Sequence, residues 1–246
     1  MAENCNIANL PFEDVSQAEQ AELLYMREEE KLARDLYLSF YEKWGVKIFE
    51  NIARSEQRHT DAIKGLLDKY SIADPIVNDE LGLFANANLQ QIYNDLLNAG
   101  NTSLIDALKV GAAVEELDIA DLVTAIEASD NQDIKAVYEN LMKGSRNHLR
   151  SYVRLLEAYT QEDYQAVYLT AEEADAIINS PIERGGYGKG VAPNGQNNDG
   201  TCTLLSSDAT DNLNLNIAGR GNGRGDGTGT GGGRKGNGDG TGTCRA

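Results

Sequence analysis

The chain has 246 residues and a formal net charge of −17, from 22 lysines and arginines against 39 aspartates and glutamates. This acidic excess argues against a nucleic-acid partner, because phosphate binding requires clustered basic side chains. It favours the attraction of metal cations instead. No apolar stretch approaches the roughly 20 residues that span a bilayer, and the N-terminus lacks an apolar signal core. We therefore expect a cytoplasmic protein with no membrane span.

The composition changes sharply near residue 181. Residues 1–180 hold 15 basic and 33 acidic side chains, whereas residues 181–246 hold 7 and 6 and are rich in glycine, asparagine, aspartate and threonine. This second part has too few large apolar residues to offset the entropy lost on ordering. We predict an N-terminal extension over residues 1–15, a helical domain over residues 16–180 and a disordered glycine-rich tail over residues 181–246. The three cysteines, Cys5, Cys202 and Cys244, lie outside the helices and share no metal-ligand spacing.

Apolar residues spaced by threes and fours predict two long helices in the first half of the chain. The first covers about residues 17–41, with Ser16 as its N-cap and Glu19 placed to complete a capping box. The second covers about residues 46–70. The segment 71–102, with one short helical pattern near its middle, is too long for a tight turn. We interpret this segment as a crossover connection.

The same spacing predicts two long helices in the second half, over about residues 103–128 and 133–159, and a weaker helix near residues 171–179. The connections within each half are short and the connection between the halves is long. This arrangement predicts an all-α fold, a four-helix bundle with one crossover between its second and third long helices.

Polar residues interrupt the apolar face of each long helix in the first half. A buried carboxylate or imidazole is unfavourable unless it is paired or bound to metal, so such residues are informative. Glu29 falls on the apolar stripe of the first helix, and we expect Glu28 and Glu30 to point away from the core. Glu56 and His59 fall on the stripe of the second helix, one turn apart.

The second half repeats the pattern. Glu115 fills a gap in the apolar stripe of the third helix, Asp118 lies at the edge of that stripe, and Glu116 is expected to face solvent. On the fourth helix, Ser145 and His148 occupy stripe positions. Both histidines of the chain are therefore expected to face the core.

A single histidine on an apolar face is usually a hydrogen-bonded core residue, but polar intrusions on four separate helices favour a shared metal site. Carboxylates can bridge two hard cations, with an imidazole as a terminal ligand to each. We expect two ions, iron first, with manganese and zinc as alternatives. The candidate ligands are Glu29, Glu56, His59, Glu115, His148 and Asp118.

Four segments carry a resemblance to known proteins: Met26 to Asp35 (MREEEKLARD), Ser55 to His59 (SEQRH), Glu115 to Ile119 (EELDI) and Gly144 to Leu149 (GSRNHL). With them, residues 23–159 resemble the ferritin-like superfamily and, more closely, an uncharacterised bacterial and archaeal family of ferritin-like domains.

The resemblance implies that each half of the bundle supplies a glutamate from one helix and a Glu-x-x-His from the next. Glu29 would then act with Glu56 and His59. The second half departs from this pattern, because Ser145 stands where the bridging glutamate is expected. Asp118 or water could supply the missing oxygen, or one metal ion could bind alone.

The resemblance also implies iron oxidation, or oxygen or peroxide chemistry, at a pair of iron ions. Two alternatives remain open. One is an iron-storage assembly of many copies, and the other is a structural or binding bundle with a degenerate metal site. Tyrosines on or beside the core faces could donate hydrogen bonds to ligands or pack the core; they are Tyr25, Tyr37, Tyr138 and Tyr152.

Overall fold

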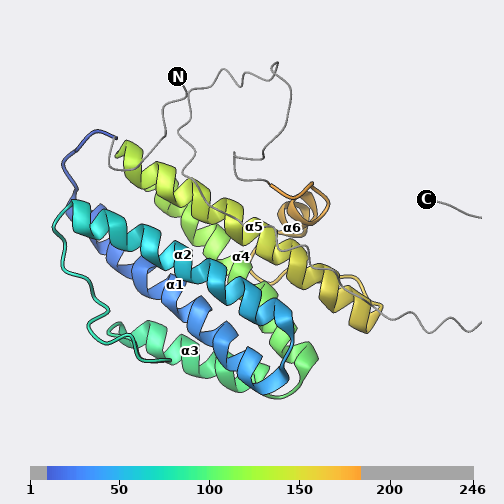
Figure 1. Cartoon of the computed structure of the whole chain (residues 1–246). Helices are drawn as coiled ribbons and strands as arrows, with labels where there is room; N and C mark the ends of the chain where they lie inside the picture. The colour runs from blue at the N-terminus through green and yellow to red at the C-terminus, as the bar shows by residue number, and fades with distance from the viewer. Residues whose placement is uncertain (1–9, 184–246) are drawn as a thin grey trace, which may run out of the picture. The chain divides into compact units, whose positions relative to one another are not determined.

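The computed structural model describes residues 10–183, which form six α-helices and, within that range, no strand (Figure 1). The helices are α1 (Gln17–Trp44), α2 (Lys47–Lys69), α3 (Ala87–Gly100), α4 (Leu104–Ala128), α5 (Gln132–Thr160) and α6 (Ala171–Ile178). The all-α prediction is confirmed, and the helix bounds lie close to the expected ones. Among these helices, none is both long and apolar enough for a membrane crossing. The glycine-rich tail, most of the N-terminal extension and the three cysteines fall outside the described residues, so their predictions stand untested.

The first turn of α1 is held by the capping box that the sequence predicts. The Ser16 hydroxyl accepts a hydrogen bond from the backbone N–H of Glu19 at 3.2 Å, and the Glu19 carboxylate accepts one from the N–H of Ser16 at 3.0 Å. The other oxygen of Glu19 accepts a hydrogen bond from the Ser129 hydroxyl at 2.7 Å. One side chain therefore joins the start of α1 to the turn between α4 and α5.

The four long helices pack in pairs. α1 packs against α2 and α4 against α5, while contacts of α1 with α4 and of α2 with α5 join the two pairs (Figure 1). α3 belongs to the crossover and packs on α1 and α4, and α6 packs on α5. The crossover therefore covers a side of α1 that would otherwise face solvent.

This covering leaves α1 buried on every side over residues 26–37. Its charged residues hold the crossover in place. The Glu28 carboxylate accepts hydrogen bonds from the N–H groups of Ala85 and Asn86, at 2.5 and 3.0 Å, next to the N-terminus of α3. The fully buried Lys31 donates to Asp35 and to the carbonyl of Glu80. Glu28, expected to point away from the core, is directed at the crossover, and it is buried because the crossover lies over that face of α1.

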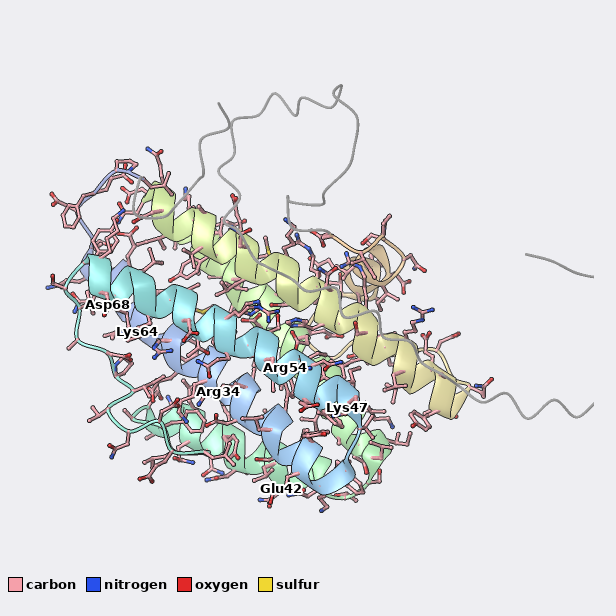
Figure 2. All side chains as sticks on the ribbon, in the orientation of Figure 1. Arg34, Glu42, Lys47, Arg54, Lys64 and Asp68 are labelled. Atoms are coloured by element: carbon pink, nitrogen blue, oxygen red, sulfur yellow. The ribbon has the colours of Figure 1, made fainter. Side chains whose placement is uncertain are left out.

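The outer face of α2 carries exposed charged side chains, whereas the charged side chains of α1 over residues 26–37 are buried. Figure 2 labels Lys47, Arg54, Lys64 and Asp68 along α2, and Arg34 and Glu42 on α1. Lys64 and Asp68 form an ion pair at 2.7 Å with both side chains largely exposed. Surface pairs of this kind contribute little to stability. α2 therefore keeps the ordinary amphipathic pattern that the sequence predicts.

The buried apolar residues form two separate clusters. One includes Leu36, Phe40, Phe49 and Tyr152, and the other includes Leu23, Leu66, Leu122 and Tyr138. The helices α1, α2 and α5 each contribute apolar residues to both clusters. On each of them, buried polar residues separate the stretch that belongs to one cluster from the stretch that belongs to the other. These polar residues thus form a layer with apolar packing on both sides, which limits the access of bulk water.

Candidate metal centre

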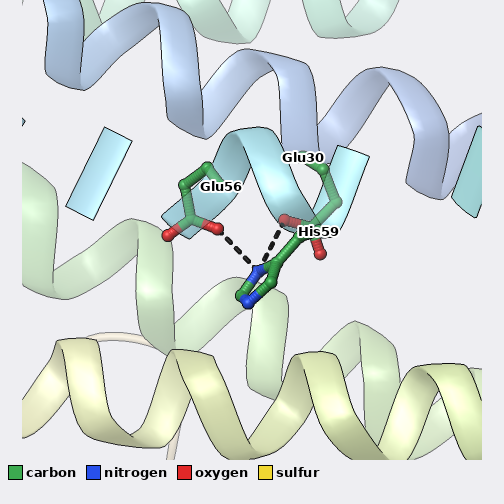
Figure 3. Close-up of side chains that lie close together, drawn as sticks. All are labelled: Glu30, Glu56 and His59. Carbon is green, nitrogen blue, oxygen red and sulfur yellow. Dashed lines mark hydrogen bonds and ion pairs between the residues drawn. The ribbon is translucent and has the colours of Figure 1, made fainter. Parts of the chain in front are cut away.

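Glu30, Glu56 and His59 form the first group of potential ligands in the polar layer (Figure 3). The Nδ1 atom of His59 lies 2.7 Å from Glu56 Oε2 and 3.2 Å from Glu30 Oε2. Glu56 and His59 come from successive turns of α2, and Glu30 reaches them from α1. All three side chains are at least nine-tenths buried. Two helices therefore direct two carboxylates and one imidazole nitrogen at a single point.

Glu56, Glu115 and His148 form the second group. The Nδ1 atom of His148 lies 2.8 Å from Glu56 Oε1 and 3.3 Å from Glu115 Oε2. Glu115 comes from α4 and His148 from α5. The rings of His59 and His148 stack with their centroids 5.6 Å apart. The two groups are therefore neighbours, and they share Glu56.

The geometry of both groups suits a cation. Two ligand atoms bound to one ion at about 2.1 Å, and separated by a right angle, lie about 3 Å apart. The nitrogen-to-oxygen distances of 2.7–3.3 Å fall around this value. Each oxygen of Glu56 faces a different histidine, which is the arrangement of a carboxylate that bridges two ions. The residues present therefore fit a pair of metal ions.

The electrostatics of the layer also favour positive charge. Burial lowers the basicity of an imidazole, but Glu56 and Glu115 outweigh it and raise the pKa of His148 to about 10. For the His59 imidazole, Glu56 and Glu30 likewise outweigh burial and raise its pKa well above the usual range. Burial raises the pKa of Glu30 to about 7 despite His59. The negative potential that draws protons to these nitrogens also draws metal cations.

Two neighbours hold the groups in position. The Tyr37 hydroxyl donates a hydrogen bond to Glu115 Oε1 at 2.6 Å, which leaves Oε2 directed at His148. Gly144 on α5 provides the space for the ring of His59, because a Cβ atom at that position would lie 2.5 Å from His59 Nε2. Such supporting contacts orient ligands and tune their affinity for metal.

Residues 19–181 match the family described as "Uncharacterized protein domain (DUF2202)". The chain belongs to this family. "Uncharacterized protein MJ0754" of Methanocaldococcus jannaschii is 54% identical over 179 residues, which cover 73% of this chain and 96% of that protein. The crystal structure of hypothetical protein MJ0754 from Methanococcus jannaschii superposes with a TM-score of 0.69 at 53% identity, covering 71% of this chain and 99% of that one.

A further similarity is partial. A methionyl-tRNA formyltransferase of Flavobacterium johnsoniae is 33% identical over 72 residues, which are 29% of this chain and 21% of that enzyme. So short a share of the enzyme carries no argument about function. The comparisons thus establish the family.

For this DUF2202 protein, sequence reasoning names four of the five residues in the two groups: Glu56, His59, Glu115 and His148. It misses Glu30, because Glu29 was assigned to the core stripe and Glu30 to the face away from it. That assignment is wrong for Glu30, which is 1% exposed. The sequence spacing could have identified Glu30 as buried. Along α1, buried residues follow one another at intervals of three and four, and Glu30 belongs to this series with Leu23, Met26, Ala33, Tyr37 and Phe40.

The structure places Glu29 and Asp118 outside both groups, although each is 6% exposed. The Ser145 hydroxyl, at the position where the resemblance implies a carboxylate, lies within hydrogen-bond distance of both Asp118 Oδ2 and the Leu141 carbonyl oxygen. The expectation that Glu116 faces solvent is wrong. Its carboxylate is fully buried and accepts hydrogen bonds from three successive N–H groups, those of residues 167–169.

Proposed function

We propose that this protein is a ferritin-like four-helix bundle whose polar layer binds two iron ions, and that it acts in iron oxidation or in oxygen or peroxide chemistry. One observation carries the proposal. The two oxygens of the buried Glu56 lie 2.7 and 2.8 Å from the Nδ1 atoms of two different histidines. A structural histidine needs one acceptor, whereas two imidazoles facing one carboxylate match a bridged pair of ions.

The origin of the ligands supports the ferritin-like part of the proposal. In that class of bundle, two helices each contribute a glutamate and two each contribute a Glu-x-x-His, all projecting inward. Here α1 contributes Glu30, α2 contributes Glu56 and His59, and α4 contributes Glu115. On α5 only His148 is retained, and Ser145 binds Asp118 instead of a metal. A metal centre held by these residues would therefore be asymmetric, with Glu56 contributing one oxygen to each group.

The donor set favours iron or manganese. Three carboxylates and two imidazoles from four helices are hard or borderline ligands and include no thiolate, and each group offers three ligand atoms. Structural zinc sites are usually tetrahedral and closed, and often contain cysteine, so zinc fits less well. When bound, a pair of ferrous ions would supply the two electrons that, with two protons, reduce one hydrogen peroxide molecule to two water molecules.

The chain's own residues then have distinct roles. Glu56 fixes the two positions relative to each other, Tyr37 orients Glu115, and Gly144 admits the ring of His59. The apolar clusters on either side of the polar layer limit bulk water, which strengthens each electrostatic interaction inside it.

The test loads the full chain with ferrous ion under anaerobic conditions, removes the excess and measures bound iron. We expect Glu56→Gln to lose both equivalents, since both groups share this residue, and Glu30→Gln to lose one. Glu42→Gln, on the exposed part of α1, is the matched control and should bind as wild type does. Adding peroxide should then oxidise the iron of the wild type and of the control.

Two other results would redirect the proposal. A wild-type chain that binds no iron after anaerobic loading would leave a structural bundle. A closed assembly of many copies in solution, retaining far more iron than two ions per chain, would favour storage.

A further inference from the structure

Beyond α5 the chain continues as a strap, residues 161–183, which contacts both α4 and α5. The strap contains α6 and ends at Glu183, the last described residue. Polar contacts tie it to the bundle at two places. The first tie is the buried Glu116 on α4, whose carboxylate accepts hydrogen bonds from the N–H groups of residues 167–169, at 2.7, 2.6 and 3.1 Å.

The second tie is a group of polar contacts at Glu183, on the face of α5 that α6 covers. Arg146 donates hydrogen bonds to both carboxylate oxygens, from Nε at 2.8 Å and from Nη2 at 2.5 Å. Arg150 donates to Glu183 Oε1 at 2.9 Å and to the Ile177 carbonyl at 2.8 Å. The Asn147 side chain pairs with the backbone N–H and carbonyl of Glu183, at 3.0 and 2.9 Å. About one turn of α5 therefore binds every polar group of Glu183.

Both ties lie next to ligands of the second group. Glu116 follows Glu115 on α4, and Asn147 precedes His148 on α5. Neighbouring residues of a helix share one stiff stretch of backbone, with fixed rotation and rise between them. A contact that fixes the helix at residue 116 or 147 therefore also fixes the direction of the ligand beside it, and supporting contacts of this kind tune metal affinity.

The first group is supported from a different part of the chain. Lys31, next to Glu30 on α1, donates a hydrogen bond to the Glu80 carbonyl in the crossover. Glu28 accepts hydrogen bonds from two N–H groups of the same connection. The two groups therefore have separate supports, the crossover for the first and the strap for the second.

The strap has little buried apolar surface of its own. Ala174 is the only one of residues 161–183 that is buried. In the second tie, the Arg146 and Glu183 side chains are 24% and 28% exposed. Segments with few buried contacts and with polar contacts open to water separate from a protein at a lower free energy than its core does. The strap is thus the part that can leave α4 and α5 while the long helices stay packed.

We infer that docking of the strap positions Glu115 and His148 and thereby controls the occupancy of the second metal position, independently of the first. Glu116 and Glu183 are positioning residues, because they act on the ligands through α4 and α5. This inference rests on the proposed function and deepens it, since it gives one of the two positions its own control.

The test compares a strap variant in two backgrounds of the full chain, each of which keeps one group. Glu30→Gln keeps the second group, and Glu115→Gln keeps the first. Ferrous ion is titrated under anaerobic conditions. We expect Glu183→Ala to weaken binding about tenfold or more in the Glu30→Gln background and to leave it unchanged in the Glu115→Gln background. Glu172→Ala, which removes an exposed carboxylate from the same strap, should change neither.

Hydrogen exchange of the metal-free chain provides a readout that does not depend on metal. In Glu183→Ala, exchange should quicken in the strap, in α5 near His148 and in α4 near Glu115, with no change in α2 near Glu56. A strap that only covers the surface would show faster exchange within residues 161–183 alone.

The outcomes separate this inference from the proposed function. If Glu183→Ala leaves ferrous affinity unchanged in the Glu30→Gln background, or lowers it equally in both backgrounds, the inference is overturned and the paired centre stands. Faster exchange confined to the strap has the same meaning. A wild-type chain that binds no ferrous ion overturns the proposed function and, with it, the control of metal occupancy.

Discussion

Gly144→Ala tests whether the space beside His59 is essential to the centre. A Cβ atom at residue 144 would lie 2.5 Å from His59 Nε2 and 2.7 Å from Cε1, closer than carbon and nitrogen atoms approach without displacement. The ring cannot retreat freely, because Nδ1 is held by Glu30 and Glu56 and the side chain is only 8% exposed. The substitution must therefore shift the imidazole or move α5 away from α2.

Two opposing effects determine how much Gly144→Ala changes the stability of the protein. Replacing glycine by alanine inside a helix gains about 1 kcal/mol, whereas overpacking a filled core costs about 1–3 kcal/mol. Gly65, inside α2, is the matched control, because a Cβ atom there would meet nothing within 4 Å. Gly65→Ala should therefore gain the helical term alone, and metal-free Gly144→Ala should be less stable than Gly65→Ala by about 1–3 kcal/mol. Urea unfolding of the metal-free proteins measures this difference.

Metal affinity is the second readout. Displacing a ligand by a few tenths of an ångström, or removing its support, typically weakens metal binding about 10–100-fold. We expect that loss in Gly144→Ala and none in Gly65→Ala, measured by ferrous or Mn²⁺ titration. If Gly144→Ala were as stable as Gly65→Ala and bound metal as wild type does, the packing of His59 against α5 would not matter, and the reasoning would be refuted.

Three further substitutions test other contacts. Burial opposes the charged form of Glu19, but the hydrogen bonds from Ser129 and Ser16 outweigh it and lower its pKa from 4.5 to about 2. The stabilisation by Glu19 is therefore present at neutral pH and is lost as the pH falls from about 5 to 2. Glu19→Gln should lower the free energy of unfolding by about 1.5–3 kcal/mol at pH 7 and should make this free energy less dependent on pH between about 5 and 2. The same pH dependence in wild type and Glu19→Gln would contradict this reasoning. Tyr37→Phe removes the hydrogen bond to Glu115 and should weaken metal binding about tenfold or more, with the fold intact by circular dichroism; equal affinity would show that Glu115 is oriented without it. Glu28→Gln weakens the acceptor for the N–H groups before α3, so hydrogen exchange should quicken first in α3, whereas uniform exchange rates would argue against a local role.

The local structure was largely predictable because it depends on local rules. The spacing of apolar residues identified the four long helices, the two short helices were expected as weaker helical patterns, and the Ser16 capping box correctly located the start of α1. His59 and His148 were correctly expected to face the core, because α2 and α5 each keep one apolar and one polar face.

α1 shows where this reasoning stops. Periodicity assigns one face to the core and the rest to solvent, an assumption that fails for a helix covered on all sides. The crossover and α3 lie over the face that would otherwise be exposed, so Glu28 is buried as an acceptor for backbone N–H groups and Glu30 is buried as a candidate ligand. The same limit applies to Glu116 on α4, which is covered by residues 167–169.

By itself, the sequence determined that residues 10–183 fold into helices and that carboxylates and two histidines lie on the inner faces of four of them, because both facts follow from spacing along single helices. Only the tertiary structure decided which side chains meet. That depends on the rotation and height of each helix relative to its neighbours, and these are set by packing between segments far apart in the chain. The sharing of Glu56 by two histidines is a consequence of that packing.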